Sequence, residues 1–261
     1  MNSTKISENI TDWLKKYIKN SNTKGFVIGI SGGIDSALTS TLCAKTGLPT
    51  FCLDMPIFQN TNEQTRATNH IKWLSSNFKN VSSKTIDLSN LFDSFRNSIE
   101  EINEKKNLLP LANSRSRLRM TTLYYFASLN NYLVAGTGNK VEDFGVGFYT
   151  KYGDGGVDLS PIADLYKTEV FQLAKYLNIN KEIIAAEPTD GLWDDQRTDE
   201  DQIGASYSEL EWAMKQKELG KNSLDFKGRK KEVFDILSKL NKQNLHKMNP
   251  IPIYLIPKEL R

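Results

Sequence analysis

Apolar side chains recur every three or four residues over the first twenty positions of the chain, with polar residues between them. The apolar set is Ile6, Ile10, Trp13, Leu14, Tyr17 and Ile18. This spacing matches the turn of an α-helix that buries one face. We therefore predict an amphipathic helix that ends near residues 20–22.

Short apolar runs then alternate with longer stretches of helical character. Each run is too short for a helix and is followed by turn residues, as is typical of buried strands. The predicted strands are 26–30, 49–55, 81–88 and 132–136, and the predicted helices are 34–46, 60–77, 89–104 and 117–130. This alternation predicts an α/β, Rossmann-like fold: a doubly wound parallel sheet with helices on both faces and ligands at the carboxyl ends of its strands.

The pattern changes after Asp158, where helices are predicted at 165–178, 199–217 and 228–243. Between the first two lies the loop 187–201, which is rich in Asp and has no apolar periodicity. We predict that this loop is a lid over bound nucleotide. No linker separates these helices from the rest, so we expect residues 1–261 to form a single domain, with the helices packed on the same sheet.

Composition narrows the class of protein. The 261 residues are 39% hydrophobic, enough for a sizeable core, and the net charge of +3 lacks the concentrated basic stripe of a nucleic-acid binder. No stretch is apolar enough for a membrane span, and the N-terminus lacks the apolar core of a signal peptide. The isolated Cys43 and Cys52 fit a reducing compartment. We expect a cytoplasmic protein with small-molecule partners, bound to neither nucleic acid nor membrane.

A glycine-rich turn joins the first buried strand to its helix. Backbone N–H groups in such a turn, together with the helix N-terminus, form a cradle for phosphate. The turn has neither the Lys of a Walker loop nor the GxGxxG of a dinucleotide loop. Its carboxylate would repel phosphate unless a cation lay between them, which points to Mg²⁺. The turn consists of Gly29, Ile30, Ser31, Gly32, Gly33, Ile34, Asp35 and Ser36.

The SGG-x-DS pattern of this turn resembles the pyrophosphate-binding loop of the ATP pyrophosphatase family. Members of that family transfer AMP to an oxygen of their substrate and release pyrophosphate. The loop alone leaves several members open, among them GMP, argininosuccinate and asparagine synthetases and the tRNA-modifying lysidine and thiouridine synthetases.

A second glycine-rich segment, FYTKYGDGGVDL at 148–159, strongly resembles the corresponding segment of NAD synthetases within that family. Further similar segments occur in the same order: SRSRLRM before the fourth predicted strand, EPTDGL and DEDQIGASY after it, and His246 with Lys247 near the end. Together they cover residues 25–247. The resemblance implies formation of NAD from deamido-NAD, ATP and ammonia through an acyl adenylate, with release of AMP and pyrophosphate.

The resemblance also implies roles for individual residues. ATP would bind the turn 29–36 with Thr137, Lys167 and Thr189, and Mg²⁺ would bind Asp35 and Glu142. Asp35 and Lys167 would act in catalysis. Deamido-NAD would contact Arg117, Lys151, Asp158, His246 and Lys247.

Ammonia is mostly ammonium at neutral pH, so a carboxylate near the acyl carbon is needed to bind and deprotonate it. Asp154 is our candidate, although an Asp-Gly pair is also typical of turns. Glutamine-dependent relatives resemble this module fused to a large amidase, for which 261 residues leave no room, so free ammonia is the expected donor, and a separate glutaminase subunit is the alternative source. The family resemblance further implies a homodimer, and the apolar helix 117–130 is either its interface or a buried central helix.

Two departures from the family pattern affect the metal site. Many family members have Asp-His after the Gly-Thr of the fourth strand, where this chain has Gly138-Asn139-Lys140. The chain also has one extra residue between Glu142 and Lys151.

The alternatives to an NAD-forming ligase are another ATP pyrophosphatase, such as a tRNA-modifying adenylating enzyme, and a non-catalytic nucleotide-binding module.

Overall fold

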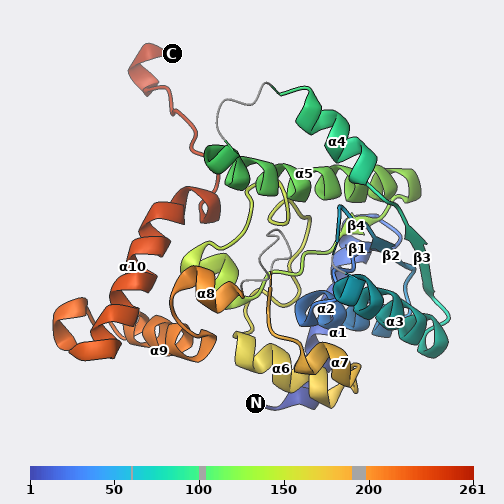
Figure 1. Ribbon diagram of the computed structural model, residues 1–261, viewed down its shortest axis with the longest axis horizontal. Helices are drawn as coiled ribbons and strands as arrows, with labels where there is room; N and C mark the ends of the chain where they lie inside the picture. The colour runs from blue at the N-terminus through green and yellow to red at the C-terminus, as the bar shows by residue number, and fades with distance from the viewer. Residues whose placement is uncertain (60, 100–103, 190–197) are drawn as a thin grey trace.

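A parallel sheet forms the centre of the protein (Figure 1). The computed structural model describes residues 1–59, 61–99, 104–189 and 198–261. Within these residues the sheet has four strands in the order β3-β2-β1-β4, all parallel. The strands are β1 (Phe26–Gly29), β2 (Thr50–Asp54), β3 (Val81–Thr85) and β4 (Leu133–Val134). The strand order reverses between β1 and β4, which confirms the predicted doubly wound sheet.

Strand β1 is buried on both faces, and its side chains alternate between two apolar clusters. Phe26 and Ile28 pack into one cluster with residues of α1 (Ser3–Asn20), α2 (Ile34–Lys45) and α6 (Lys167–Tyr176). Val27 packs into the other cluster with residues of α4 (Ser89–Asn97) and α5 (Glu104–Asn130). This alternation follows from the two-residue period of a strand. It explains why the segment reads as a continuous apolar run in the sequence.

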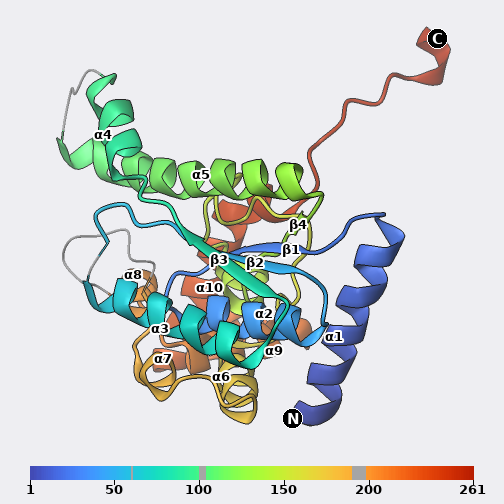
Figure 2. The same ribbon diagram turned by 90° about the vertical axis from the view of Figure 1, so that its right-hand side faces the viewer.

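Helices cover both faces of the sheet, as predicted. Figure 2 shows α4 and α5 on one side, and α2, α3 and α6 on the other, with α1 at the edge. The helix bounds are α1 Ser3–Asn20, α2 Ile34–Lys45, α3 Thr61–Asn77, α4 Ser89–Asn97, α5 Glu104–Asn130, α6 Lys167–Tyr176 and α7 Lys181–Ala185.

Several predicted boundaries are wrong. Helix α5 begins at Glu104 rather than at 117, and it contains Pro110. Proline and a weak apolar periodicity hid its first half, because a proline lacks the N–H that an interior helical position needs. Strand β4 has only two residues, although a bridge between Ala135 and Leu159 continues its direction. The predicted helix 199–217 is divided at Gly204, whose φ of 84° ends α8.

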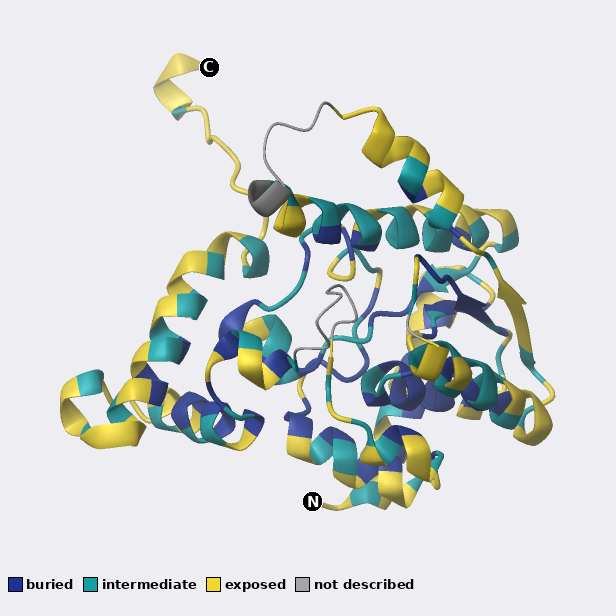
Figure 3. Cartoon of the chain, viewed as in Figure 1, coloured by how far each residue is buried: buried dark blue, intermediate teal, exposed yellow. Residues whose placement is uncertain are grey.

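Of the C-terminal helices predicted to pack on the sheet, α6 does so, because its apolar residues join the cluster that contains β1. For the helices after it the prediction is wrong, because they form a separate apolar cluster. This cluster joins α8–α10 to a π-helix, η1, and contains no strand residue. Amphipathic helices bury their apolar faces against whichever partner is nearest, and here they bury them against each other and η1 (Figure 3). The bounds are η1 Val141–Val146, α8 Asp199–Ile203, α9 Tyr207–Glu218, η2 Ser223–Asp225, α10 Gly228–Met248 and η3 Lys258–Leu260.

After α10 the chain extends away from the body of the protein in both views (Figures 1 and 2). Ile253, Tyr254 and Leu255 in this tail are about four-fifths exposed. Across the part of the chain that the structure describes, none of the helices has the length and apolar character needed to cross a bilayer.

Candidate functional site

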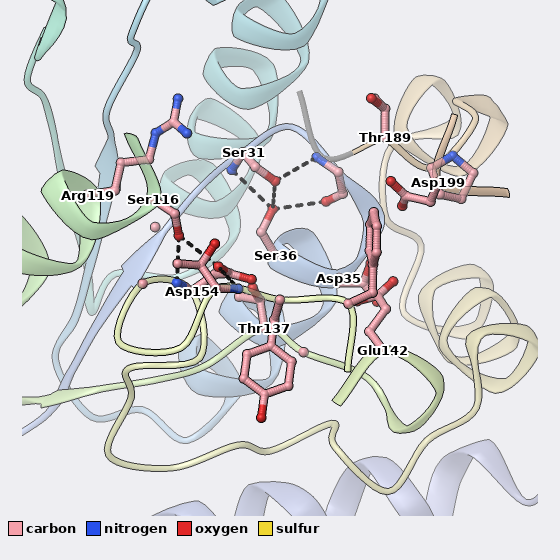
Figure 4. Close-up of a pocket in the computed structure, with 18 of the residues that line it drawn as sticks. Ser31, Asp35, Ser36, Ser116, Arg119, Thr137, Glu142, Asp154, Thr189 and Asp199 are labelled. Atoms are coloured by element: carbon pink, nitrogen blue, oxygen red, sulfur yellow. Dashed lines mark hydrogen bonds between the residues drawn. The ribbon is translucent and has the colours of Figure 1, made fainter. Parts of the chain in front are cut away.

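A cavity of about 600 Å³ opens at the carboxyl ends of β1, β2 and β4. The loops after β1 and β4 both contribute to its wall, as expected where the strand order of a parallel sheet reverses. The cavity is lined by most of the turn 29–36, including Gly29, Ser31 and Asp35. Further predicted site residues also line it: Thr137, Glu142, Asp154, Lys167 and Thr189. Figure 4 shows the labelled side chains among them around the cavity: Ser31, Asp35, Thr137, Glu142, Asp154 and Thr189.

The turn after β1 is held open by its own serines. The Ser36 hydroxyl accepts a hydrogen bond from the Ser31 amide (3.2 Å) and donates one to the Gly33 carbonyl (3.0 Å), as Figure 4 shows. Gly32 has a φ of 82°, and a Cβ there would lie 2.4 Å from the Glu63 carbonyl oxygen. Only glycine fits this position, and α2 begins two residues later. The turn therefore directs the N-terminus of a 12-residue helix at the cavity, as phosphate binding requires.

Lys167 joins the two carboxylates that the sequence assigned to a metal. Its Nζ lies 2.6 Å from Asp35 Oδ2 and 3.0 Å from Glu142 Oε1, and its side chain is 3% exposed. Burial alone would lower the pKa of Lys167, but the two carboxylates outweigh burial and hold that pKa above its usual value. Lys167 is therefore a permanent cation at the centre of the site.

Asn139 orients both carboxylates, and sequence reasoning missed it. Its amide Nδ2 donates to Asp35 Oδ1 at 3.1 Å, while its Oδ1 accepts from the backbone amides of Val141 (3.1 Å) and Glu142 (3.2 Å). The departure from the family pattern at 138–140 thus supplies a side chain that ties the β4 loop to the β1 loop. The position of Asn139, just after the Gly-Thr-Gly, was the available signal.

The extra residue between Glu142 and Lys151 falls next to a change in helix type. Residues Val141–Val146 form a π-helix, which ends at Gly147 with a φ of 67°. A π-helical turn takes one more residue than an α-helical turn. A π-helix at this place is what one added residue would produce, and the Glu142 carboxylate lies beside Lys167.

Asp154 lies in the cavity wall with its carboxylate already engaged. Its Oδ1 accepts hydrogen bonds from the Ser116 hydroxyl (2.7 Å) and the Thr150 amide (2.9 Å), and its own amide donates to Ser116 (2.8 Å). Burial raises the pKa of Asp154, although these hydrogen bonds oppose the shift. The residue thus closes the loop 150–154 onto α5.

Asp143 is a further acidic residue in the cavity, for which the sequence offered no signal. Its carboxylate lies against Gly138, where a Cβ would be 2.2 Å from Asp143 Oδ1. Burial, and then the negative charges of Glu142, Asp154 and Asp35, raise the pKa of Asp143 to about 8. A side chain at 138 would displace this carboxylate.

Arg119 is the basic residue that α5 contributes to the cavity wall, whereas the predicted Arg117 lies outside it. The Arg119 guanidinium donates to the carbonyl of Met55 (3.0 Å) and to the side-chain oxygen of Gln59 (2.8 Å). Burial and the neighbouring Arg115 lower its pKa to about 10. The alternation of arginines in SRSRLRM had given no means of choosing between them.

The residues assigned to deamido-NAD occupy two places. Lys247 lines the cavity and donates to the carbonyls of Gly147 (2.9 Å) and Tyr149 (2.8 Å). Outside the lining, Arg117 donates to the Lys151 carbonyl and Lys151 donates to the His246 carbonyl (2.7 Å), so these three form one exposed basic surface.

Asp158 makes structural contacts at β4. Its carboxylate accepts from the Val134 amide (2.8 Å) and from the Tyr124 hydroxyl (3.0 Å). Of the predicted lid, Glu187, Pro188, Thr189 and Asp199 line the cavity, as does Gln202 just after it. Residues 190–197 lie outside the described residues.

The donor set fits a hard divalent cation. Asp35 and Glu142 converge on one point, because a single ammonium contacts both, and Mg²⁺ is commonly held by one or two carboxylates with phosphate and water. The described residues contain no group of three or more His, Cys, Asp or Glu side chains that would hold a metal alone. Phosphate oxygens would thus have to complete the coordination.

Comparisons with known proteins agree on one family. The model of the family described as NAD synthase matches residues 6–251. An NH3-dependent NAD(+) synthetase from Finegoldia magna is 42% identical over 81% of this chain and 84% of its own length.

Two solved structures are similar over nearly the whole chain. One is an NMN synthetase from Francisella tularensis, with a TM-score of 0.82 and 32% identity over 99% of each chain. The other is an NH3-dependent NAD synthetase from Campylobacter jejuni in complex with the nitrate ion, with a TM-score of 0.79 and 31% identity over 98% of this chain and 100% of that one.

Proposed function

The chain belongs to the NAD synthase family, and we propose that it is a ligase that forms NAD from deamido-NAD, ATP and ammonia, releasing AMP and pyrophosphate. One observation carries this proposal. The Asp35, Lys167 and Glu142 side chains meet within 3.0 Å beside a glycine turn shaped for phosphate. A non-catalytic nucleotide-binding module would have no need for that group.

The first step activates the pyridine carboxylate. A carboxylate does not accept ammonia directly, since its leaving group would be oxide. Attack of its oxygen on the α-phosphorus of ATP forms an acyl adenylate and expels pyrophosphate. The turn 29–36 would receive the departing pyrophosphate through its amides, and Lys167 would follow the negative charge as it develops. The chain supplies positioning and charge here, and no protein nucleophile is required.

Asp35 and Glu142 are the proposed Mg²⁺ ligands. Two carboxylates and one lysine leave a net charge of −1 at this point, which a divalent cation would convert to a positive charge facing the triphosphate. When bound, the ion would neutralise charge on the phosphate oxygens. Thr137 and Thr189 lie in the same wall and are the proposed hydroxyl donors to ATP.

The second step is attack of ammonia on the acyl carbon, which breaks the bond to AMP. Asp154 is the proposed carboxylate that binds ammonium and receives its proton. Its place in the cavity wall supports this role, and its raised pKa is in keeping with proton transfer. The hydrogen bonds from Ser116 and Thr150 would fix its orientation.

The rest of deamido-NAD is proposed to bind the basic surface formed by Arg117, Lys151 and His246, together with Lys247 and Asp158.

We also propose a homodimer. Tyr125 and Leu129 on α5 are 63% and 65% exposed, and large apolar side chains of this kind are typical of interfaces. Residues 1–261 are proposed to act as one catalytic unit, since residues from α2 to α10 line the same cavity. We further propose that the protein acts in the cytoplasm.

A second acceptor is favoured by the similarity to the Francisella protein. An NMN synthetase would carry out the same amidation on nicotinate mononucleotide, which lacks the adenylyl half of deamido-NAD. The activation chemistry at Asp35, Lys167 and Glu142 would be unchanged. The two candidates therefore differ only in what binds beyond the pyridine ring and its ribose phosphate.

The test is pyrophosphate release with ATP, Mg²⁺ and ammonium, supplied in turn with deamido-NAD and with nicotinate mononucleotide, while NAD or NMN is quantified. We expect equal amounts of pyrophosphate and NAD with deamido-NAD, and loss of both in Asp35→Asn. A higher kcat/KM with the mononucleotide would assign the second function. Pyrophosphate without either amide would indicate another acceptor, and no pyrophosphate with any acceptor would contradict the enzyme assignment.

A further inference from the structure

Tyr207 contacts three charged side chains at the edge of the cavity: Glu142, Asp199 and Lys167. Its hydroxyl donates to Glu142 Oε1 at 2.7 Å and lies 3.0 Å from Asp199 Oδ2, and the Lys167 ammonium lies over its ring at 4.7 Å from the centroid. We infer that Tyr207 is a positioning residue that holds the Glu142 carboxylate in place for the divalent cation. This inference rests on the proposed function.

The Tyr207 hydroxyl has one proton to share between two carboxylates. Both acceptors are carboxylates, and the contact to Glu142 is the shorter, at 2.7 Å against 3.0 Å for Asp199. The proton therefore belongs mainly to the Glu142 contact. Without the hydroxyl, nothing would separate the Glu142 and Asp199 carboxylates at this point, and Glu142 would turn away from Asp199 and lose its place beside Asp35.

Tyr207 matters most once nucleotide is bound. Lys167 and Tyr207 both donate to the Glu142 carboxylate, and Asn139 is a further side-chain partner of it. If Lys167 moves towards the triphosphate, as the proposed function requires, the Tyr207 hydroxyl remains as the donor anchored in the C-terminal helices. A carboxylate that must exchange a lysine for a metal ion needs such a fixed partner to keep its orientation.

The backbone around Tyr207 makes it a rigid support. It is the first residue of α9, follows the N-cap Ser206, and donates its own amide to Glu200 Oε1 at 2.7 Å. Its side chain is 5% exposed within the apolar cluster of the C-terminal helices. The hydroxyl thus projects from a packed helix start into the metal site, and it connects the C-terminal helices to the chemistry.

Tyr207→Phe removes the hydroxyl and keeps the ring. The matched control is Tyr166→Phe, because Tyr166 lies in the same apolar cluster, is 8% exposed, and directs its hydroxyl at Glu218 outside the cavity. Binding of Mn²⁺ would be titrated by electron paramagnetic resonance with ATP present and no pyridine acceptor. We expect Tyr207→Phe to weaken Mn²⁺ binding about tenfold or more, within the range for partners of metal ligands.

Kinetics supply a second readout. The Mg²⁺ concentration for half-maximal pyrophosphate release should rise by the same factor in Tyr207→Phe, with most of kcat recovered at saturating Mg²⁺. Tyr166→Phe should match the wild type in both measurements. Unchanged Mn²⁺ binding in Tyr207→Phe, or a loss of kcat that Mg²⁺ does not restore, would overturn the inference.

A double-mutant cycle covers the case in which Tyr207→Phe also lowers the unfolding midpoint. In a Glu142→Gln background a positioning role requires Tyr207→Phe to have no further effect on Mn²⁺ binding, whereas an additive loss would overturn it. The Mn²⁺ titration uses ATP alone. It therefore decides the role of Tyr207 even if the wild type amidates neither pyridine substrate and the proposed function fails.

Discussion

The ammonium of Lys167 lies 2.6 Å from the carboxylate of Asp35, although 132 positions separate the two residues. Asp35 opens the helix after β1, and Lys167 is the first residue of α6. This ion pair therefore ties the phosphate turn to the second half of the chain. Because Lys167 is buried and the Asp35 side chain is only 18% exposed, the effects of the pair extend to stability as well as to catalysis.

Lys167→Met should destabilise the protein when no metal is present. Removing the lysine leaves the Asp35 and Glu142 carboxylates facing each other without a countercharge, and breaking a buried pair typically costs about 3 kcal/mol or more. Urea unfolding at pH 8 would measure the loss. Added Mg²⁺ should raise the unfolding midpoint of this variant more than that of the wild type, because the cation replaces the missing charge.

Lys140→Met is the control for that measurement. Lys140 Nζ lies 3.3 Å from Asp164 and 3.5 Å from Glu218, whose side chains are 98% and 58% exposed. Ion pairs of this exposed kind contribute at most about 1 kcal/mol. An equal loss of stability in the two variants, or no response of Lys167→Met to Mg²⁺, would contradict the proposed shared cation site.

Asp154→Asn separates the two steps of the reaction. If Asp154 takes the proton from ammonium, formation of the amide should slow about 100-fold or more. Exchange of labelled pyrophosphate into ATP, which requires only the first step, should persist. Ser116→Ala removes one hydrogen bond to Asp154 and keeps its carboxylate, so it should retain most of the amidation rate. Equal losses of amidation in the two variants would assign Asp154 to loop structure alone.

His70 should make stability depend on pH below neutrality. It is fully buried beside Ser40, and burial lowers its pKa from 6.5 to about 4. Between these values the unfolded chain binds a proton that the folded chain rejects, so the contribution of His70 to stability falls as the pH falls from about 6.5 to 4 and is constant above about 6.5. The loss amounts to about 3 kcal/mol at 1.36 kcal/mol per pH unit.

Urea unfolding of His70→Gln between pH 4 and 8 tests this dependence. The variant should show a shallower loss of stability towards acid than the wild type. His246→Gln changes the other, exposed histidine of the chain and should keep the wild-type slope. Identical slopes for wild type and His70→Gln would assign the acid sensitivity to other groups.

Gly138→Ala should cost about 1–3 kcal/mol by overpacking. The backbone at Gly138 is outside the left-handed region, so the strain comes from the contact with Asp143 rather than from φ. The double variant with Asp143→Ala should recover most of the loss, because the displaced carboxylate is then absent. Thermal or urea unfolding of the four proteins forms the cycle, and strictly additive losses would show that the two positions do not compete for space.

Local patterns in the sequence were sufficient for the order of elements and for the phosphate turn. The four apolar runs became parallel strands, and the SGG-x-DS turn joined β1 to α2, because strand burial and glycine conformation act over a few neighbouring residues. Family resemblance, rather than a local pattern, suggested Asp35, Glu142 and Lys167 as site residues, and the structure brings these three side chains together. Helix α5 was the main local failure, since Pro110 concealed its first half.

The sequence by itself thus determined the fold class and the ends of the strands where ligands would bind. Only the tertiary structure decided which side chains meet: that Lys167 bridges Asp35 and Glu142, that Asn139 and Tyr207 orient them, and that α8–α10 pack on η1 instead of the sheet. These contacts join residues far apart in the chain. Hydrogen bonds and buried charges depend on distance in space, and a periodic pattern carries information about one element only.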